Sequence, residues 1–229
     1  MLVKEMQTYY SKRAAEYDES MGYNDTGVVE CLAPVISTLK ALGRGRRVLE
    51  LACGPAFWTQ HVASVAESVK ATDFNASTLE QARKKNLPWD RVSLAQADAY
   101  NLSAIPGEFN MVMAVDWLAH VPRSRIESFL DGVATRVPRG SQIAFVDQLP
   151  GPRSLSGVID YEGNHIQERT LNGEGKFRVI KHFFDDEELY KMFSPISTDV
   201  RITRFPGCRR ILVSATSTNS QQGRESLTS

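Results

Sequence analysis

The sequence predicts a parallel α/β sheet with helices on both faces. Short apolar runs such as "RRVLELA" and "FNMVMAV" have the length and composition of buried strands. Segments with a helical spacing of apolar residues separate these runs, as the crossovers between parallel strands require. The last two runs, "STDVRITRF" and "RRILVSAT", are joined by a short connection at Pro206-Gly207, which predicts an antiparallel pair at one edge of the sheet.

The predicted elements follow one another without an internal repeat. Two helices come first, and the second runs from Thr26 to about Gly43. Five strand candidates then alternate with helices. A β-hairpin over residues 169–184, a helix begun by Asp185 and the antiparallel pair complete the chain. The five strand candidates are, in order, "RRVLELA", "SVKATD", "VSLAQAD", "FNMVMAV" and "SQIAFVDQL".

The composition disfavours several classes of function. Lys plus Arg and Asp plus Glu are balanced at 27 residues each, so no global field attracts nucleic acid or an anionic membrane. The N-terminus lacks the apolar core of a signal peptide, and we expect no apolar run to cross a bilayer. Three scattered cysteines indicate neither disulfides nor a zinc site. We therefore expect a cytoplasmic protein with one domain, residues 1–216, and a flexible polar tail at 217–229.

The ends of the first four strands carry the strongest chemical signal. The segment "VLELACGPAFWT" (48–59) is a strand, a bend at Gly54 and the start of a helix. The second strand ends at Asp73, where a carboxylate can bind ribose hydroxyls. The third strand ends at Asp98 and the fourth at Asp116. Because the carboxyl ends of parallel strands meet at one edge, we expect these groups to form one site, although each acid alone could simply cap a loop.

The glycine bend distinguishes two classes of cofactor. A dinucleotide requires the G-x-G-x-x-G spacing, because the backbone must approach the pyrophosphate closely. Here Ala52 and Ala56 occupy two positions where glycine is usual. S-adenosylmethionine (SAM) has no phosphate, and its cationic sulfonium and amino groups tolerate a carboxylate-rich site. The pattern therefore favours SAM over NAD.

These motifs resemble those of class I SAM-dependent methyltransferases. The matching strings are "ELACGPAFWT", "ATDFN", "AQADAYNL" and "MVMAVDWLAHVP", and the resemblance extends from "YYSKRAAEYD" to the final strands. It implies a Rossmann-like seven-stranded, mostly parallel sheet with one antiparallel edge strand, and a lid segment at residues 1–27 that closes over SAM. It also implies S-adenosylhomocysteine (SAH) as the product, and no metal. The residues it assigns to the cofactor are Tyr10, Arg13, Glu50, Ala52, Gly54, Trp58, Asp73, Phe74, Asp98, Ala99, Asp116 and Trp117.

The segment "RTLNGEGKFRVIKHFF" (169–184) predicts a hairpin with cations on an apolar face. Glycine and asparagine at residues 172–175 supply the turn. Side chains alternate along a strand, so Lys181 shares a face with Val179, and Arg169 shares one with Leu171. A lysine or arginine on an inward face requires an explanation.

A buried cation needs an anionic partner, because burying an uncompensated charge is costly. The chain can supply Asp147 or Glu162. A phosphonate, phosphate or carboxylate of a substrate can do so instead, and arginine would bind such a group in bidentate fashion. Alternatively, the hairpin is solvated and these are ordinary surface charges.

A closer resemblance concerns the methyl acceptor. The strings "WLAHVP", "AFVDQ" and "RTLNGEGKFRVIKHF" are similar to those of small phosphonate O-methyltransferases of phosphonate-antibiotic biosynthesis. This resemblance implies that an insertion at residues 152–184 covers the acceptor pocket. It also implies that Tyr23, His120, Arg169 and Lys181 hold an anionic head group, with His120 as an orienting donor. A histidine bonded to backbone in a loop is the alternative for His120.

The sequence thus predicts an enzyme that moves a methyl group from SAM to an oxygen of a small anionic metabolite, a phosphonate or a carboxylate. N- or C-methylation of another small metabolite with His120 as base is one alternative. A non-catalytic SAM-binding module is another. We expect a monomer or homodimer whose partner is a small molecule rather than nucleic acid or a membrane.

Overall fold

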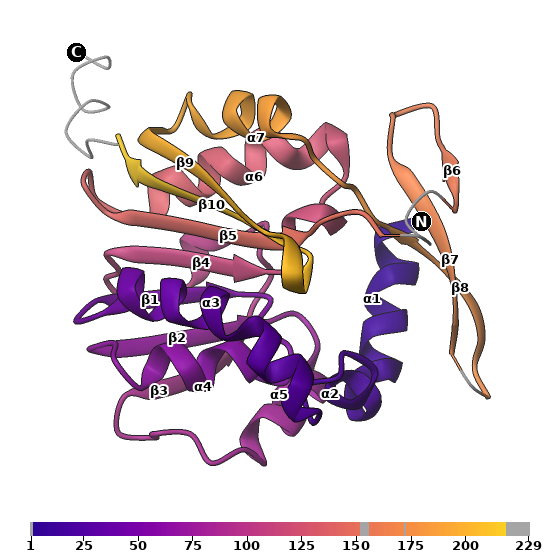
Figure 1. Cartoon of the computed structure of the whole chain (residues 1–229), viewed down its shortest axis with the longest axis horizontal. Coiled ribbons are helices and arrows are strands. Elements are labelled where there is room, and N and C mark those ends of the chain that lie inside the picture. The colour runs from indigo at the N-terminus through magenta and orange to yellow at the C-terminus, as the bar shows by residue number, and fades with distance from the viewer. Residues whose placement is uncertain (1, 152–155, 172, 219–229) are drawn as a thin grey trace.

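A seven-stranded sheet forms the centre of the protein (Figure 1). The computed structural model describes residues 2–151, 156–171 and 173–218. Within these residues the strand order is β3-β2-β1-β4-β5-β10-β9. The strands are β1 (Arg47–Leu51), β2 (Ser68–Asp73), β3 (Val92–Gln96), β4 (Met111–Val115), β5 (Gln142–Gln148), β9 (Ser197–Phe205) and β10 (Arg210–Ser217).

The direction of the strands agrees with the predicted fold class. Strands β1 to β5 pair in parallel. Strand β10 pairs antiparallel with both β5 and β9, so it is the one reversed strand and lies beside the edge strand β9. The prediction of a mostly parallel sheet that ends in an antiparallel pair is therefore confirmed.

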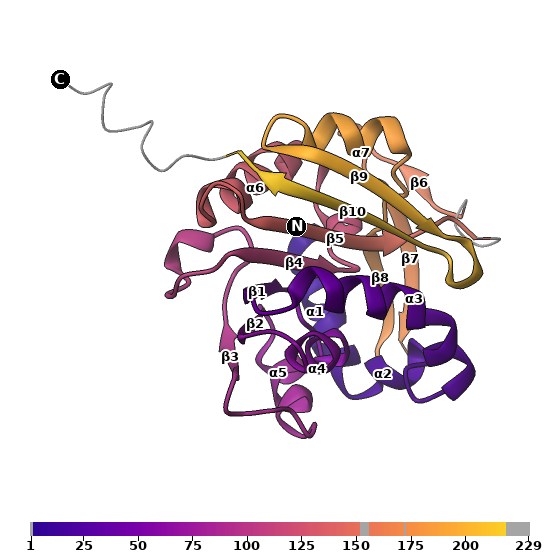
Figure 2. The same ribbon diagram turned by 60° about the vertical axis from the view of Figure 1, so that its left-hand side comes forward.

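Helices cover both faces of the sheet (Figure 2). One face packs against α3 (Thr26–Gly43), α4 (Phe57–Ala63) and α5 (Ala76–Arg83), and the other against α6 (Arg123–Arg136) and α7 (Asp186–Phe193). Alternation along β1 explains this arrangement, because Val48 faces the first group of helices and Leu49 and Leu51 face the second. Helix α7 begins with a capping box, in which Asp185 and Glu188 satisfy each other's backbone N–H groups.

Helix α3 is the one helix in the described ranges that is long and apolar enough to cross a membrane by length and composition alone. We expected no such run from the sequence. Leu32, Val35 and Leu39 of α3 are buried against the main sheet, so one face of this helix packs on the protein while 22% of its residues are buried. This feature is therefore weak evidence for a membrane span.

A second, small sheet stands apart from the main one. It contains β6 (Val158–Ile159), β7 (His165–Leu171) and β8 (Gly175–Ile180) in that order. Strands β7 and β8 form the predicted hairpin, and β6 was not predicted. Gly173 and Gly175 adopt positive φ in the turn, at 77° and 90°, as a tight hairpin turn requires. Asn172 lies outside the described residues, as do residues 152–155 of the expected insertion and residues 219–229 of the expected tail.

Helix α1 (Leu2–Arg13) connects the two sheets. In Figure 1 it crosses the carboxyl ends of the parallel strands, with the hairpin on its far side. Met6 and Tyr9 of α1 pack against Leu171, Val179 and Ile180 of the hairpin. The chain then continues through η1 (Ala14–Glu16) and α2 (Tyr17–Ser20), so the first predicted helix is broken after Arg13. The remaining short 3-10 turns are η2 (Leu102–Ala104), η3 (Leu118–His120) and η4 (Pro206–Cys208).

Ionic contacts tie α1 to the hairpin at both ends. The Glu5 carboxylate accepts hydrogen bonds from the Arg178 backbone N–H at 2.6 Å and from its Nη2 at 2.8 Å. Lys12 pairs with Glu174 at the other end of α1. Helix α1 and the hairpin therefore form one covering layer over the strand ends.

We expect Glu5→Ala to loosen this layer without affecting the main sheet. The variant removes the contacts to Arg178, and partly exposed ion pairs of this kind contribute about 0.5–1 kcal/mol. Amide hydrogen exchange in α1 should therefore become about two to five times faster, while exchange in β4 stays unchanged. Glu80→Ala, which alters an exposed carboxylate on α5, is the matched control. Unchanged exchange in α1 would show that the apolar contacts alone hold the helix.

Candidate functional site

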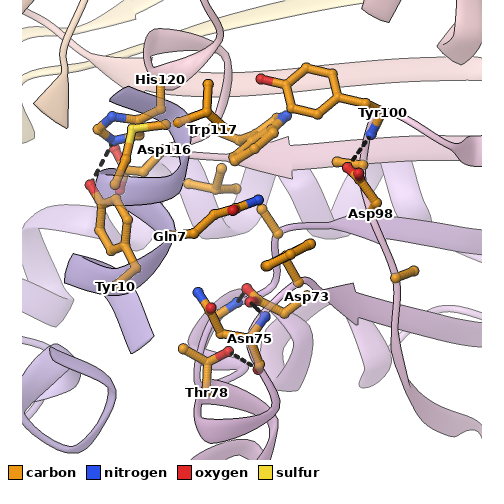
Figure 3. A pocket seen from close by; sticks show the side chains of 18 of the residues that line it. Gln7, Tyr10, Asp73, Asn75, Thr78, Asp98, Tyr100, Asp116, Trp117 and His120 are labelled. Carbon is orange, nitrogen blue, oxygen red and sulfur yellow. Dashed lines mark hydrogen bonds between the residues drawn. The ribbon is translucent and has the colours of Figure 1, made fainter. Parts of the chain in front are cut away.

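A pocket lies at the carboxyl ends of β1 to β4, under α1 (Figure 3). In Figure 3, Gln7 and Tyr10 reach into it from α1, while Asp73, Asp98 and Asp116 approach from the strand ends. The rule that ligands bind at this edge of a parallel sheet predicted its location. The pocket is lined by Val3, Met6, Gln7, Tyr10, Tyr17, Ala52, Gly54, Asp73, Phe74, Asn75, Thr78, Ala97, Asp98, Ala99, Tyr100, Val115, Asp116, Trp117 and His120.

The bend after β1 forms one wall of the pocket. Gly54 has φ of +56°, and a Cβ placed there would meet no atom within 4 Å, so a side chain would occupy open space beside the pocket. Ala52 and Ala56, the two alanines that replace the usual glycines, also adopt positive φ, at 51° and 66°. The backbone thus keeps a glycine-like path although two of its residues carry a Cβ, at a cost of about 1–3 kcal/mol each.

Asp73 holds this bend in place. Its Oδ2 accepts a hydrogen bond from the Gly54 N–H at 3.0 Å, and its Oδ1 accepts one from the Asn75 N–H at 2.8 Å. Burial raises the pKa of Asp73, and the backbone donors oppose that shift. Each carboxylate oxygen retains a second lone pair, so Asp73 can accept further hydrogen bonds from a ligand.

Aromatic rings form the other end of the pocket. The rings of Tyr100 and Trp117 lie 5.8 Å apart, and the Arg125 guanidinium carbon is 3.7 Å from the Tyr100 ring centre. The Tyr100 hydroxyl and the Trp117 indole N–H are buried and have no hydrogen-bond partner among the described residues. Asp98, which is exposed, accepts a hydrogen bond from the Tyr100 N–H at 2.9 Å. Flat apolar walls with unpaired polar groups suit a planar, hydrogen-bonding ring.

Asp116 lies where the pocket turns toward the hairpin. Its φ of +55° places it in the left-handed region, which few non-glycine residues adopt. Its Oδ1 accepts hydrogen bonds from Arg210 Nη1 at 2.7 Å and Gln148 Nε2 at 2.9 Å, while Oδ2 has no partner in the described part of the chain. Burial alone would raise the pKa of Asp116, but Arg210 and Lys181 together hold it below its usual value.

The hydrogen bonds of His120 define its tautomer. Nδ1 contacts the Ile180 carbonyl oxygen, which can only accept, so Nδ1 carries the proton. Burial, assisted by Lys181, lowers the pKa of His120 to about 3, so the ring is neutral at pH 7. Nε2 therefore accepts a hydrogen bond from the Tyr10 hydroxyl at 3.0 Å (Figure 3). His120 is thus bonded to backbone, as in the alternative given above for this residue. In this arrangement its ring has no N–H left to donate to a ligand.

Lys181 is buried, as strand alternation predicted, and only 3% of its surface is exposed. Its ammonium group forms no hydrogen bond or ion pair with any described residue. Burial lowers the pKa of Lys181, while the more distant carboxylates of Asp116 and Asp147 act in the opposite direction. A buried ammonium without a bonded partner is costly unless something else supplies an acceptor.

Arg169 differs from the expectation, because its side chain is exposed. Its neighbours on the same strand face, Gln167 and Leu171, are buried as the alternation requires. The Arg169 Nη2 donates a hydrogen bond to Gln167 Oε1 at 2.6 Å. Alternation sets the face on which a side chain lies, but its exposure depends on what covers that face, and here α1 covers Leu171.

Comparisons with known proteins agree with this geometry. Residues 48–140 match the family model described as a methyltransferase domain. The structure resembles that of DhpI with SAH, at 26% identity over 95% of this chain and 97% of that one, with a TM-score of 0.76. It also resembles the complex of DhpI with SAM and HEP, at 29% identity over 93% and 97%, with a TM-score of 0.77. These matches support a class I SAM-dependent methyltransferase.

A further structural match supports the fold and carries no information about the substrate. The PH0226 protein from Pyrococcus horikoshii OT3 shares the fold, with 18% identity over 83% of this chain and 89% of that one, and a TM-score of 0.65. No curated protein sequence matches the chain. The pocket of this methyltransferase fits SAM, because it combines an open glycine bend with unpaired polar groups beside aromatic walls.

Six residues assigned to the site by resemblance, Trp58 among them, lie outside the pocket lining. Glu50 is buried beneath it, where it accepts a hydrogen bond from Thr59 Oγ1 at 2.6 Å. The Tyr23 hydroxyl accepts one from Trp58 Nε1 at 3.2 Å. Arg13 donates to Ser20 Oγ at 2.7 Å. Arg169 and Lys181 also lie outside the lining, toward the hairpin.

Sequence reasoning missed several lining residues. Gln7 lies one helical turn before Tyr10, so the helical period could have identified it. Asn75 and Thr78 follow Asp73 in the turn and first helical turn after β2, where ligand-facing polar groups are common. No sequence pattern placed Tyr17 in the pocket, because the direction of its side chain depends on the break in the helix after Arg13. The other lining residues that the analysis did not select are Val3, Met6, Ala97, Tyr100 and Val115.

The described residues contain no group of three or more His, Cys, Asp or Glu side chains that could hold a metal ion. All three cysteines are free thiols, and Cys53, next to Gly54, is buried.

We expect Gly54→Ala to weaken SAH binding at least tenfold. The added Cβ would occupy the open space beside the pocket and would also strain the positive φ. Gly45→Ala is a matched control, because Gly45 has φ of +64° and equally open surroundings but does not line the pocket. Both variants should lose a similar amount of thermal stability, and only Gly54→Ala should raise the SAH Kd in calorimetry. If the two variants bound SAH with equal affinity, the bend at Gly54 would not be part of the binding site.

We expect Glu50→Gln to stabilise the protein above about pH 8. Burial raises the pKa of Glu50 to about 8, whereas the unfolded chain has an ordinary carboxyl pKa of about 4.3. The folded state therefore binds the proton more tightly, and stability falls as the pH rises from the unfolded value to the folded one. Glutamine keeps the bond from Thr59 but does not ionise. The difference in Tm between the variant and the native protein should grow from pH 5 to pH 9, and Glu80→Gln should show no such trend.

Proposed function

We propose that this methyltransferase transfers the methyl group of SAM to an oxygen of a small anionic metabolite, a phosphonate or a carboxylate. The observation that carries the proposal is Lys181, whose side chain is buried near Asp116 toward the hairpin. Its ammonium lies 5.8 Å from the centre of the Phe183 ring and has no hydrogen-bond or ion-pair partner among the described residues. An anionic acceptor would supply the missing hydrogen-bond acceptor.

The arrangement of the pocket supports a particular orientation of SAM. We propose that the Gly54 bend receives the methionine part, that Asp73 accepts hydrogen bonds from the ribose, and that Asp98 and Ala99 hold the adenine beside Tyr100 and Trp117. The sulfonium would then lie near Asp116 and Tyr10, facing the hairpin. The methyl group would thus point toward Lys181.

The neighbouring structures add support for the acceptor class. The DhpI complex contains HEP beside SAM, in a chain that is 29% identical and aligned over 93% of this one. The exposed Arg169 is close enough to Lys181 and His120 to affect their pKa values, so we assign it to the entrance of the acceptor site.

The chemistry needs alignment more than a base. SAM supplies an electrophilic methyl group, whose bond to sulfur breaks as the acceptor oxygen attacks in line. A carboxylate or phosphonate oxygen is already ionised at neutral pH. Lys181 would bind the oxygens that do not attack, since a cation on the attacking oxygen would weaken its nucleophilicity. His120 would act through Tyr10, by orienting the hydroxyl that it accepts from.

The state of His120 disfavours the alternative of N- or C-methylation with this histidine as base. The lone pair of Nε2 accepts the Tyr10 hydroxyl proton, and the pKa of about 3 makes the ring a weak base. Release of SAH with a panel of phosphonates, carboxylates and amines would separate the three candidates. Turnover with amines alone would favour N-methylation, and no turnover with any member would favour a non-catalytic module.

Charge and thiol content support a setting for the enzyme. The balanced charge of 27 cationic and 27 acidic residues supports a small-molecule partner over nucleic acid. A cytoplasmic monomer or homodimer is consistent with the three free thiols.

We expect Lys181→Ala to raise the acceptor KM about 10- to 100-fold while the SAH Kd changes little. A charge-assisted hydrogen bond to a desolvated anion contributes about 1.5–3 kcal/mol. Arg169→Ala should have a smaller effect, because its side chain is exposed. Lys176→Ala is the matched control, since Lys176 belongs to the same hairpin but pairs with Glu168 at the surface. Lys181→Met, which keeps the volume of the stem, separates loss of charge from loss of packing. Loss of SAH affinity with an unchanged acceptor KM would contradict the assignment.

A further inference from the structure

A cluster of buried charges lies behind the proposed acceptor site. It contains two carboxylates, Asp116 and Asp147, and two cations, Lys181 and Arg210, all at least nine-tenths buried. They come from four elements: the ends of β4 and β5, the segment after β8, and the start of β10. The role that we assign to this cluster rests on the proposed anionic acceptor.

The charges of the cluster cancel when all four groups are ionised. Lys181 and Arg210 contribute two positive charges, and Asp116 and Asp147 two negative ones. An anion that entered beside Lys181 would then leave a net negative charge in a buried site, next to two carboxylates. Interactions between charges at such depth are weakly screened, so this state is unfavourable. The sulfonium of SAM beside Asp116 would offset one negative charge, but SAH carries no such charge. In the SAH-loaded protein, binding therefore requires that one carboxylate lose its charge.

The hydrogen bonds of the two carboxylates identify which one can change. Asp116 is bonded to Arg210 and Gln148, which favour its ionised form. Asp147 accepts one long bond at 3.3 Å, from the Ala119 N–H to Oδ2, and its buried Oδ1 has no partner in the residues described. The groups that face Asp147 are Lys181, Asp116, Arg210 and the Ala119 N–H, with a neutral His120 beside them. Asp147 is thus the carboxylate held least firmly in its ionised form.

We propose that Asp147 takes up a proton from solvent when an anion of the acceptor class binds to the SAH-loaded protein. One O–H bond forms on its carboxyl group, and the cluster then has a single net positive charge, which the guest neutralises. Methyl transfer removes the positive charge of SAM and the negative charge of the guest together, so Asp147 returns its proton to solvent when the anion leaves the SAH-loaded site. Asp147 is therefore a positioning residue that acts on the acceptor through Lys181.

The proton uptake sets a pH dependence for binding. Burial raises the pKa of Asp147 to about 7, which leaves it partly ionised near neutral pH. Because the acceptor binds the protonated form, its apparent affinity should be constant below pH 6 and fall about tenfold per pH unit above pH 7. The effect belongs to the acceptor KM, since SAM binds away from Asp147, which does not line the pocket.

Methanesulfonate tests the proposal, because this mimic of a phosphonate monoanion keeps its single charge at every pH used. Its binding to the SAH-loaded protein is measured by calorimetry from pH 6 to pH 8.5, in Tris and in triethanolamine. These buffers lack anionic groups and differ in ionisation enthalpy, so the difference in heat reports the protons taken up. The native protein should take up close to one proton per anion at pH 8.5 and bind about 30-fold more weakly than at pH 6.

Asp147→Asn supplies the decisive comparison. The amide oxygen can keep the bond from the Ala119 N–H, and the side chain is neutral at every pH, as the protonated acid is. We expect the variant to bind as the native protein does at pH 6, to take up no proton, and to lose the pH dependence. Asp131→Asn, which alters an exposed carboxylate on α6, should behave as the native protein.

The outcomes separate this inference from the proposed function. Binding at all pH values without proton uptake would overturn the role of Asp147 and leave the anion site intact. Loss of binding in Asp147→Asn at pH 6 would overturn it as well, since it would mean that the ionised carboxylate is needed. Absence of binding to the native protein at pH 6 would contradict the anion site and, with it, this inference.

Discussion

The burial of one ammonium group, that of Lys181, is the constraint on which the acceptor end of this protein depends. An amine at this depth persists only if charges of the opposite sign stand near it or a ligand completes its surroundings. Here Asp116 and Asp147 act on the ammonium from beyond hydrogen-bonding distance. A bound guest can therefore supply its hydrogen-bond acceptor. The same carboxylates would repel an anion. The site therefore needs a group whose charge can change, and the sparse bonding of Asp147 makes it that group.

Packing of α1 against the hairpin turns these charges into a closed site. The segments are far apart in the sequence, and Met6 and Tyr9 bury the apolar side of the hairpin next to Lys181. The same contact brings Tyr10 to His120 and thereby defines which nitrogen of the histidine carries the proton. The covering layer thus excludes water, which strengthens every charge interaction beneath it.

Several residues with strained backbone conformations lie around the cofactor pocket. Ala52, Ala56 and Asp116 are three of the five non-glycine residues with positive φ in the described ranges. Each costs about 1–3 kcal/mol, so the surrounding sheet must compensate for them. Ala52 and Ala56 adopt the backbone path of the bend although neither is glycine. At Asp116 the unusual φ aims the carboxylate toward Arg210 and Gln148 rather than along the strand.

The sequence by itself determined the sheet, its reversed strand and the edge at which ligands bind. Alternating apolar runs and helical periods are local signals, and the carboxyl ends of parallel strands meet wherever such a sheet forms. Asp73, Asp98 and Asp116 could therefore be brought together from their positions alone. Only the tertiary structure decided that Lys181 is buried without a bonded partner, that Arg169 is exposed, and that His120 accepts from Tyr10. These properties depend on which element covers each side chain, and that is set by the docking of α1 on a hairpin more than 150 residues away, which no local pattern records.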